Sequence, residues 1–158
     1  MFAVRLVQLI ETHADKLSEA LTHKLKNAEE CRELLSKVPA HEIKHRTYEV
    51  YRHLGEWLLT KTLSEVEERY IGFGVRRARQ GVPFSQIMFA IHMTKQVLWD
   101  YFLMEGLLEP EALIGEMELV RSLGQFFDRA EYFAAIGYEQ VGKSELSHAS
   151  VPHEVVSG

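Results

Sequence analysis

Residues 68–102 of this chain read ERYIGFGVRRARQGVPFSQIMFAIHMTKQVLWDYF, and this stretch decides the fold class. Its apolar residues recur at the spacing of a helix. Gly81 is a natural C-terminal stop for one helix, and Pro83 is a favoured first-turn residue for the next. The second helix is apolar almost all round, which is typical of a helix buried on most sides. The stretch therefore predicts helices over about 63–80 and 83–105, the second being central unless part of it faces a partner chain.

Helical spacing continues on both sides of this stretch. It predicts further helices over about 2–26, 40–61 and 110–142, and no segment alternates with period two for long. Helices joined by short loops pack as antiparallel neighbours. The sequence therefore predicts an all-α, antiparallel, four-helix-like bundle of about five helices. We expect one domain over residues 1–143 and, because the remaining segment has little apolar content and no period, a disordered tail over 144–158.

Composition excludes several classes of protein. Of the 158 residues, 46% are hydrophobic and 26% charged, which is an ordinary globular balance. The net charge of −5 argues against a protein that coats nucleic acid. A single cysteine, Cys31, allows neither an internal disulfide framework nor a Cys-rich zinc site. No apolar run approaches the roughly 18 residues that span a bilayer, and no cleavable signal is evident, so we expect a cytoplasmic protein without membrane contact.

Signatures of catalysis are missing from the sequence. It contains no G-x-G-x-x-G, no P-loop and no G-x-S-x-G, and no acid–base pair falls at an obvious cleft, so we expect no enzyme and no catalytic residue. His41 and His45 are read as part of a solvated helix face, and no metal site is expected. His92, beside Met88 and Trp99, fits either a histidine packed against apolar side chains or a haem ligand. We expect no cofactor, with haem as the alternative.

Two charges interrupt apolar stripes and point to an ion pair. Arg77 continues the stripe of the 63–80 helix, and Glu131 lies in that of the 110–142 helix. Charged side chains are rarely buried unless they are paired. If consecutive helices run antiparallel, both residues come out at one height, near Ile87. The sequence therefore predicts a structural Arg77–Glu131 pair.

A third charge, Lys95, marks the predicted ligand site. It falls among Met88, Trp99 and other apolar residues of its helix, and Gly124 is expected across from it. An apolar pocket with one basic group would suit a carboxylate or an acidic side chain of a partner. Together with His92, these residues form the hypothetical ligand-binding set. The alternative is that Lys95 reaches solvent along its flexible stem.

The length of the last predicted helix suggests a dimer. The 110–142 helix would be longer than its neighbour and would leave an apolar overhang carrying Ile136, Tyr138 and Val141. Such a surface is normally covered. We therefore expect a homodimer with these three residues in the interface.

The chain also resembles a known family. The segments VPAHEIKHRTYEVYRHLGEWL (38–58), the 68–102 stretch and LGQFFDRAEYFAAIGYEQ (123–140) are similar to the N-terminal domain of bacterial RsbR and RsbRD proteins, the RsbT co-antagonist family. The resemblance implies an all-helical sensory or regulatory domain of stress signalling, often dimeric, which passes a signal to an output domain. Related input domains look like globins without haem, so a globin-like arrangement is implied as well.

Taken with this resemblance, the residues favour a non-enzymatic signalling domain. It would act through a change in helix packing that a ligand or a partner biases. The expected partners are a second copy of the chain and a protein signalling partner or output domain. The alternative is a haem-binding or small-molecule-binding sensor.

Overall fold

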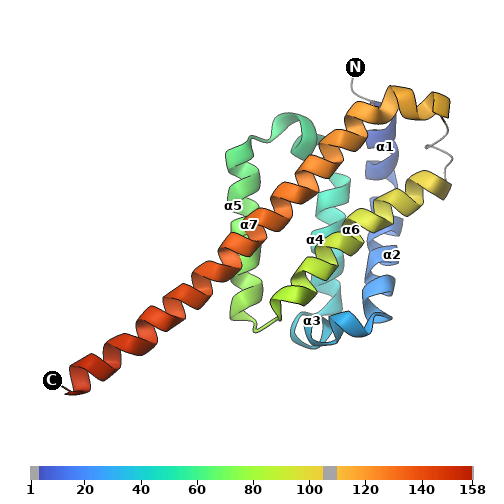
Figure 1. Ribbon diagram of the computed structural model, residues 1–158. Coiled ribbons are helices and arrows are strands. Elements are labelled where there is room, and N and C mark those ends of the chain that lie inside the picture. The colour runs from blue at the N-terminus through green and yellow to red at the C-terminus, as the bar shows by residue number, and fades with distance from the viewer. Residues whose placement is uncertain (1–3, 105–109, 158) are drawn as a thin grey trace.

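The computed structural model describes residues 4–104 and 110–157, and the regular secondary structure in these ranges is entirely helical (Figure 1). The helices are α1 (Val4–Thr12), α2 (Ala14–Lys26), α3 (Arg32–Lys37), α4 (Ala40–Arg52), α5 (Leu63–Arg79), α6 (Phe84–Met104) and α7 (Pro110–Ser157), with a short 3-10 turn η1 (Glu29–Cys31) and a π-turn η2 (Glu56–Thr60). The predicted all-α class is confirmed.

The helices predicted from the central stretch lie within a residue or two of their expected positions. The α5 helix begins with a capping box, in which the Thr62 hydroxyl accepts from the Glu65 N–H (3.2 Å) and the Glu65 carboxylate accepts from the Thr62 N–H (2.7 Å). It ends before Gly81, whose φ of 76° is the left-handed conformation that favours glycine. The predicted C-terminal stop is confirmed.

The other expected helices differ in extent from those in the structure. The predicted 2–26 helix is divided at His13, whose ψ of 17° lies outside the α-helical range. The predicted 40–61 helix ends at Arg52 and is followed by η2. At the C-terminus, α7 continues as helix to Ser157 through the segment for which the sequence predicts disorder. Propagating an existing helix costs far less than starting a new one, which favours such an extension.

The main helix contacts do not follow chain order. The α5 helix packs most extensively along α7 and makes little direct contact with α6, while α2 lies against both α4 and α6. The Tyr70 and Phe126 rings lie 5.8 Å apart, and the Tyr138 hydroxyl donates to the Val82 carbonyl oxygen (2.7 Å), so α5 and α7 run in the same direction. The consecutive helices α6 and α7 run antiparallel as expected, and the common direction of α5 and α7 agrees with that arrangement (Figure 1).

Two glycines allow the close crossing of α5 and α7. A Cβ atom at Gly74 would collide with the carbonyl oxygen of Ala134, and one at Gly137 would collide with that of Ile71. No side chain can turn aside to relieve these contacts, because both obstacles are backbone atoms. The crossing therefore requires glycine at both positions.

The core lies between these helices and includes one face of α6. Ile87, Ile91, Leu98 and Phe102 of α6 are buried against the other helices. His92 and Gln96 of the same helix are exposed. The predicted central helix is therefore buried along one side and reaches solvent on the other.

Candidate functional site

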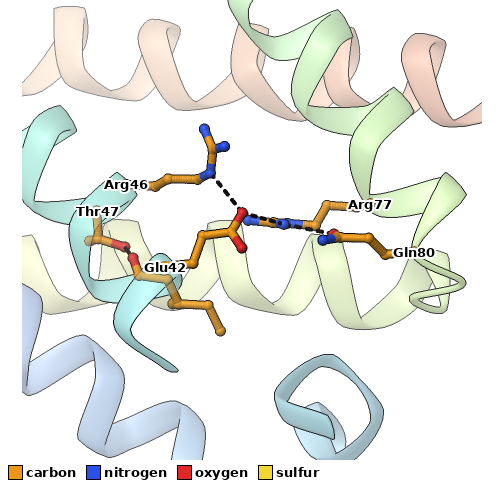
Figure 2. Close-up of polar contacts among 6 residues, drawn as sticks. Glu42, Arg46, Thr47, Arg77 and Gln80 are labelled. Atoms are coloured by element: carbon orange, nitrogen blue, oxygen red, sulfur yellow. Dashed lines mark hydrogen bonds and ion pairs between the residues drawn. The ribbon is translucent and has the colours of Figure 1, made fainter. Parts of the chain in front are cut away.

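A buried cation lies between α4 and α5. The Arg77 side chain is only 3% exposed, and its Nη1 donates to Oε1 of Glu42 (3.3 Å) and to Oε1 of Gln80 (2.7 Å). The same Glu42 oxygen accepts from Nε of Arg46 (3.2 Å). Figure 2 shows the Glu42 carboxylate between the two arginines. The Glu42 carboxylate thus accepts hydrogen bonds from two guanidinium groups.

The ion pair predicted between Arg77 and Glu131 is therefore wrong in its partner. Glu131 lies instead beside His92, with Oε1 3.3 Å from Nε2. The physical reason is the register of the helices. Gly74 of α5 meets Ala134 of α7, so Arg77 lies a turn further along α7 than Glu131 does, and it pairs with Glu42 of α4 instead. The predicted height assumed equal spacing from the connecting turns, which could not show this offset.

The electrostatics of the cluster reflect an excess of positive charge. Burial acts to raise the pKa of Glu42, but the hydrogen bond from Arg46 and the charge of Arg77 outweigh it and hold that pKa below its usual 4.5. Burial and the charges of Arg46, Arg77 and Arg69 lower the pKa of Arg76, against a weak opposing effect of Glu42. The cluster therefore holds four guanidinium groups, and Glu42 pairs with two of them.

These arginines border a cavity of about 100 Å³ between α4, α5 and α6. Its interior is formed by buried apolar side chains from four helices: Leu21, Leu25, Ile43, Val50, Ile91 and Phe127. Arg76 is exposed, and Arg46 and Arg69 are half-buried. The cavity thus combines an apolar interior with a basic rim, at the place where α5 and α6 separate from each other.

The four arginines differ in the partners that hold them. Arg69 lies over the Trp57 ring, 4.8 Å from its centroid, and Arg46 is held by Glu42. Arg76 forms no ion pair with any carboxylate in the described part of the chain. The Arg77 guanidinium lies over the Phe73 ring, 5.2 Å from its centroid. It donates hydrogen bonds through Nη1, and its Nε and Nη2 have no hydrogen-bond acceptor among residues 4–104 and 110–157. Arg76 and Arg77 therefore retain the capacity to bind an anion.

The residues of the predicted ligand site lie elsewhere. Lys95 is half-buried, Met88 and Trp99 pack against the core, and His92 is exposed, and none of these four side chains lines the cavity. A Cβ atom at Gly124 would meet no atom within 4 Å, so this glycine faces open space. A ligand site around Lys95 stays a prediction.

The side chains predicted for the dimer interface are partly covered by their own chain. Val141 is buried, and Ile136 packs against the core. The Tyr138 ring lies 5.3 Å from that of Phe84, in addition to its hydrogen bond to Val82. Their role in a dimer stays a prediction.

Sequence reasoning missed Glu42, Arg46, Arg69 and Arg76 as members of a site. One signal could have drawn attention to them. Arg69 and Arg76 are separated by two helical turns, and they flank Tyr70, Phe73 and Arg77, which form the inner stripe of α5. Basic residues that flank an apolar stripe lie where a groove would meet solvent.

Two further observations concern metals and membranes. No group of three or more His, Cys, Asp or Glu side chains within the described ranges is arranged to hold a metal ion. No described helix is long and apolar enough to cross a membrane.

Comparison with known proteins gives the family. Residues 8–149 match the RsbT co-antagonist protein RsbRD N-terminal domain. This chain belongs to the RsbRD N-terminal domain family. The match extends the resemblance seen in the sequence and takes in α2 to α6 and most of α7. The family is a regulatory co-antagonist family and not an enzyme class. No curated protein and no solved structure gives a significant match to this RsbRD-type domain.

Proposed function

We propose that this chain is a non-enzymatic signalling domain that regulates a protein partner of the RsbT class, and that it acts through a change in the packing of α7. The observation that carries the proposal is the family match over residues 8–149. The family description names RsbT as the protein that is antagonised, so an RsbT-class protein is the partner of choice. A role in the bacterial stress response follows from the same relationship.

The fold supports α7 as the element that transmits the signal. It packs against both α5 and α6, and its C-terminal part projects away from the other helices (Figure 1). A long helix held at one end by a close crossing converts a small shift at the crossing into a larger displacement at the other end. A ligand or partner that favours one packing of α5 on α7 would thereby change what the projecting part presents.

We also propose a homodimer, as the length of α7 suggests. Large apolar side chains are exposed at the end of α6 and along α7, namely Leu103, Met104, Met117 and Tyr132. Exposed apolar groups of this size favour association. Light scattering on the eluted protein at tens of micromolar should give twice the mass of the 18.2 kDa chain, and a mass near 18.2 kDa would contradict the dimer.

The regulatory role is tested by titrating the purified chain with the RsbT protein of the same bacterium in a calorimeter. A saturable heat is expected. The Gly74→Ala variant, which disturbs the α5–α7 crossing, should change the affinity several-fold, whereas Gly72→Ala on the same helix should not. A Cβ at Gly72 makes only an ordinary contact, 3.6 Å from Nη1 of Arg76. No heat of binding, or equal effects of the two variants, would contradict the proposal.

A further inference from the structure

We infer that the cavity between α4, α5 and α6 is a binding site for a small apolar carboxylate, with the apolar body inside the cavity and the carboxylate on Arg76 and Arg77. The inference concerns binding by this chain and holds whether or not the chain acts on RsbT. It assigns a ligand class to a site on the opposite side of α6 from the exposed His92.

The interior of the cavity determines the size and character of the apolar part. Aliphatic side chains and the Tyr70, Phe73 and Phe127 rings form its walls. The Tyr70 hydroxyl interacts with Arg69, and the other uncharged polar side chains among the lining residues are those of Thr47 and Thr94. Both hydroxyls already donate to carbonyl oxygens of their own helices, Ile43 and Ala90 (2.8 Å each). A cavity of about 150 Å³ with similar walls binds benzene. The volume of about 100 Å³ therefore suits a single small ring or a short branched chain.

The rim determines the charge of the ligand. Four guanidinium groups border the cavity, and the Glu42 carboxylate pairs with two of them, those of Arg46 and Arg77. This excess is confined to one place in a chain whose net charge is −5. Like charges repel one another, so an anion at the rim would relieve the repulsion as well as form hydrogen bonds.

The buried guanidinium of Arg77 supplies the second, independent observation. A side chain that is 97% buried normally has its polar groups satisfied, because an unpaired buried donor is costly. Arg77 lines the cavity with Nε and Nη2 unpaired within the described residues, although Glu42 and Gln80 lie on its Nη1 side. A carboxylate can accept from two N–H groups of one guanidinium at once, and this geometry fits the donors that remain.

Occupation of this site would affect the packing of the helices. The cavity is lined by residues of α5, α6 and α7, and α5 and α6 make little direct contact with each other. A ligand between them would add contacts that the unoccupied protein lacks. Binding should therefore stabilise one arrangement of α5 relative to α6.

The test is a titration of the full chain with benzoate, followed by calorimetry and by thermal unfolding. We expect a Kd of about 1 mM or tighter, in keeping with the affinity that small ligands reach per atom, and a rise in Tm with benzoate concentration. Benzamide has the same ring without the charge, and acetate has the charge without the ring. Both should bind at least ten-fold more weakly than benzoate.

Variants identify the site. Arg76→Gln removes the exposed cation of the rim and should weaken benzoate binding about ten-fold or more, as loss of a charged hydrogen-bond partner does. Arg79→Gln is the matched control, because Arg79 is exposed on the same helix and does not line the cavity. Ala90→Leu places a larger side chain at the cavity wall and should abolish binding while the circular dichroism spectrum stays helical.

Four results would overturn the inference. They are no benzoate binding at about 10 mM, equal binding of benzoate and benzamide, equal effects of Arg76→Gln and Arg79→Gln, and an equal Tm shift from inorganic phosphate. The last would indicate adsorption of any anion to a basic surface. None of these results depends on RsbT, so failure here is distinguishable from failure of the proposed function.

Discussion

The glycines of α5 and α7 allow a quantitative test of the structure in two matched pairs. Gly74 and Gly137 lie in the helix crossing, where an added Cβ would collide with backbone carbonyl groups. Gly72 lies on the same helix as Gly74, and Gly142 lies on the same helix as Gly137. A Cβ at Gly72 makes one ordinary contact, and a Cβ at Gly142 meets nothing within 4 Å. The change of Gly to Ala is thus identical in chemistry at all four positions and differs only in surroundings.

The expected magnitudes follow from two opposing effects. Alanine in a helix interior is about 0.5–1 kcal/mol more stable than glycine, because less backbone entropy is lost on folding. Gly72→Ala and Gly142→Ala should therefore raise the free energy of unfolding by about that amount, and Tm by about 1–4 °C. In the crossing, the helices must move apart, and overpacking of this kind typically costs about 1–3 kcal/mol. The gain from alanine is common to both members of a pair, so we expect a difference of about 1–3 kcal/mol within each pair.

The assay is urea unfolding followed by far-ultraviolet circular dichroism, at one fixed protein concentration so that any association affects all variants equally. The slope of free energy against urea concentration should stay the same, which shows that the variants differ in stability and not in the extent of unfolding. If Gly74→Ala and Gly137→Ala stabilise the protein as much as their partners do, α5 and α7 do not approach closely, and the parallel crossing described above is refuted.

Three further predictions concern single side chains. Glu42→Gln leaves the buried Arg77 without its carboxylate and should lower the free energy of unfolding by about 1–3 kcal/mol in the same urea assay. The control is Glu131→Gln: the partner of Glu131, His92, is exposed, so this change should alter the free energy of unfolding by less than about 0.5 kcal/mol. The pKa of Glu42 is lowered in the folded protein, so the contribution of this carboxylate to stability is present above its usual pKa of 4.5 and is lost as the pH falls through the lower folded-state pKa. Between about pH 5 and pH 3, the Glu42→Gln protein should therefore lose less stability than the wild-type protein. Equal losses would refute this. Burial, aided by the charge of Glu30, raises the pKa of the Cys31 thiol to about 11, so a thiol reagent at about pH 8 should react with the native protein far more slowly than with the unfolded one, and equal rates would show that Cys31 is accessible.

The elements that could be predicted are those with a local cause. Gly81 and Pro83 end one helix and begin the next through their own backbone preferences, so the bounds of α5 and α6 follow from the residues near them. The all-α class follows in the same way, because the apolar spacing of 3.6 residues is a property of each segment by itself. The burial of Arg77 could also be predicted from the sequence, because a charged residue that continues an apolar stripe must face the core.

What the sequence by itself determined, then, is which segments are helices and which face of each is apolar. Only the tertiary structure decided which helices touch. The partner of Arg77 depends on the register of α5 along α7 and on its position beside α4. That register is set at the close backbone contacts of Gly74 and Gly137, which involve residues far apart in the chain. The arginine-rimmed cavity has the same origin, because it exists only where α5 and α6 separate after their short turn. Periodicity describes each helix relative to its own axis and carries no information on the distance between two axes, so a site formed between helices becomes visible only once they are packed.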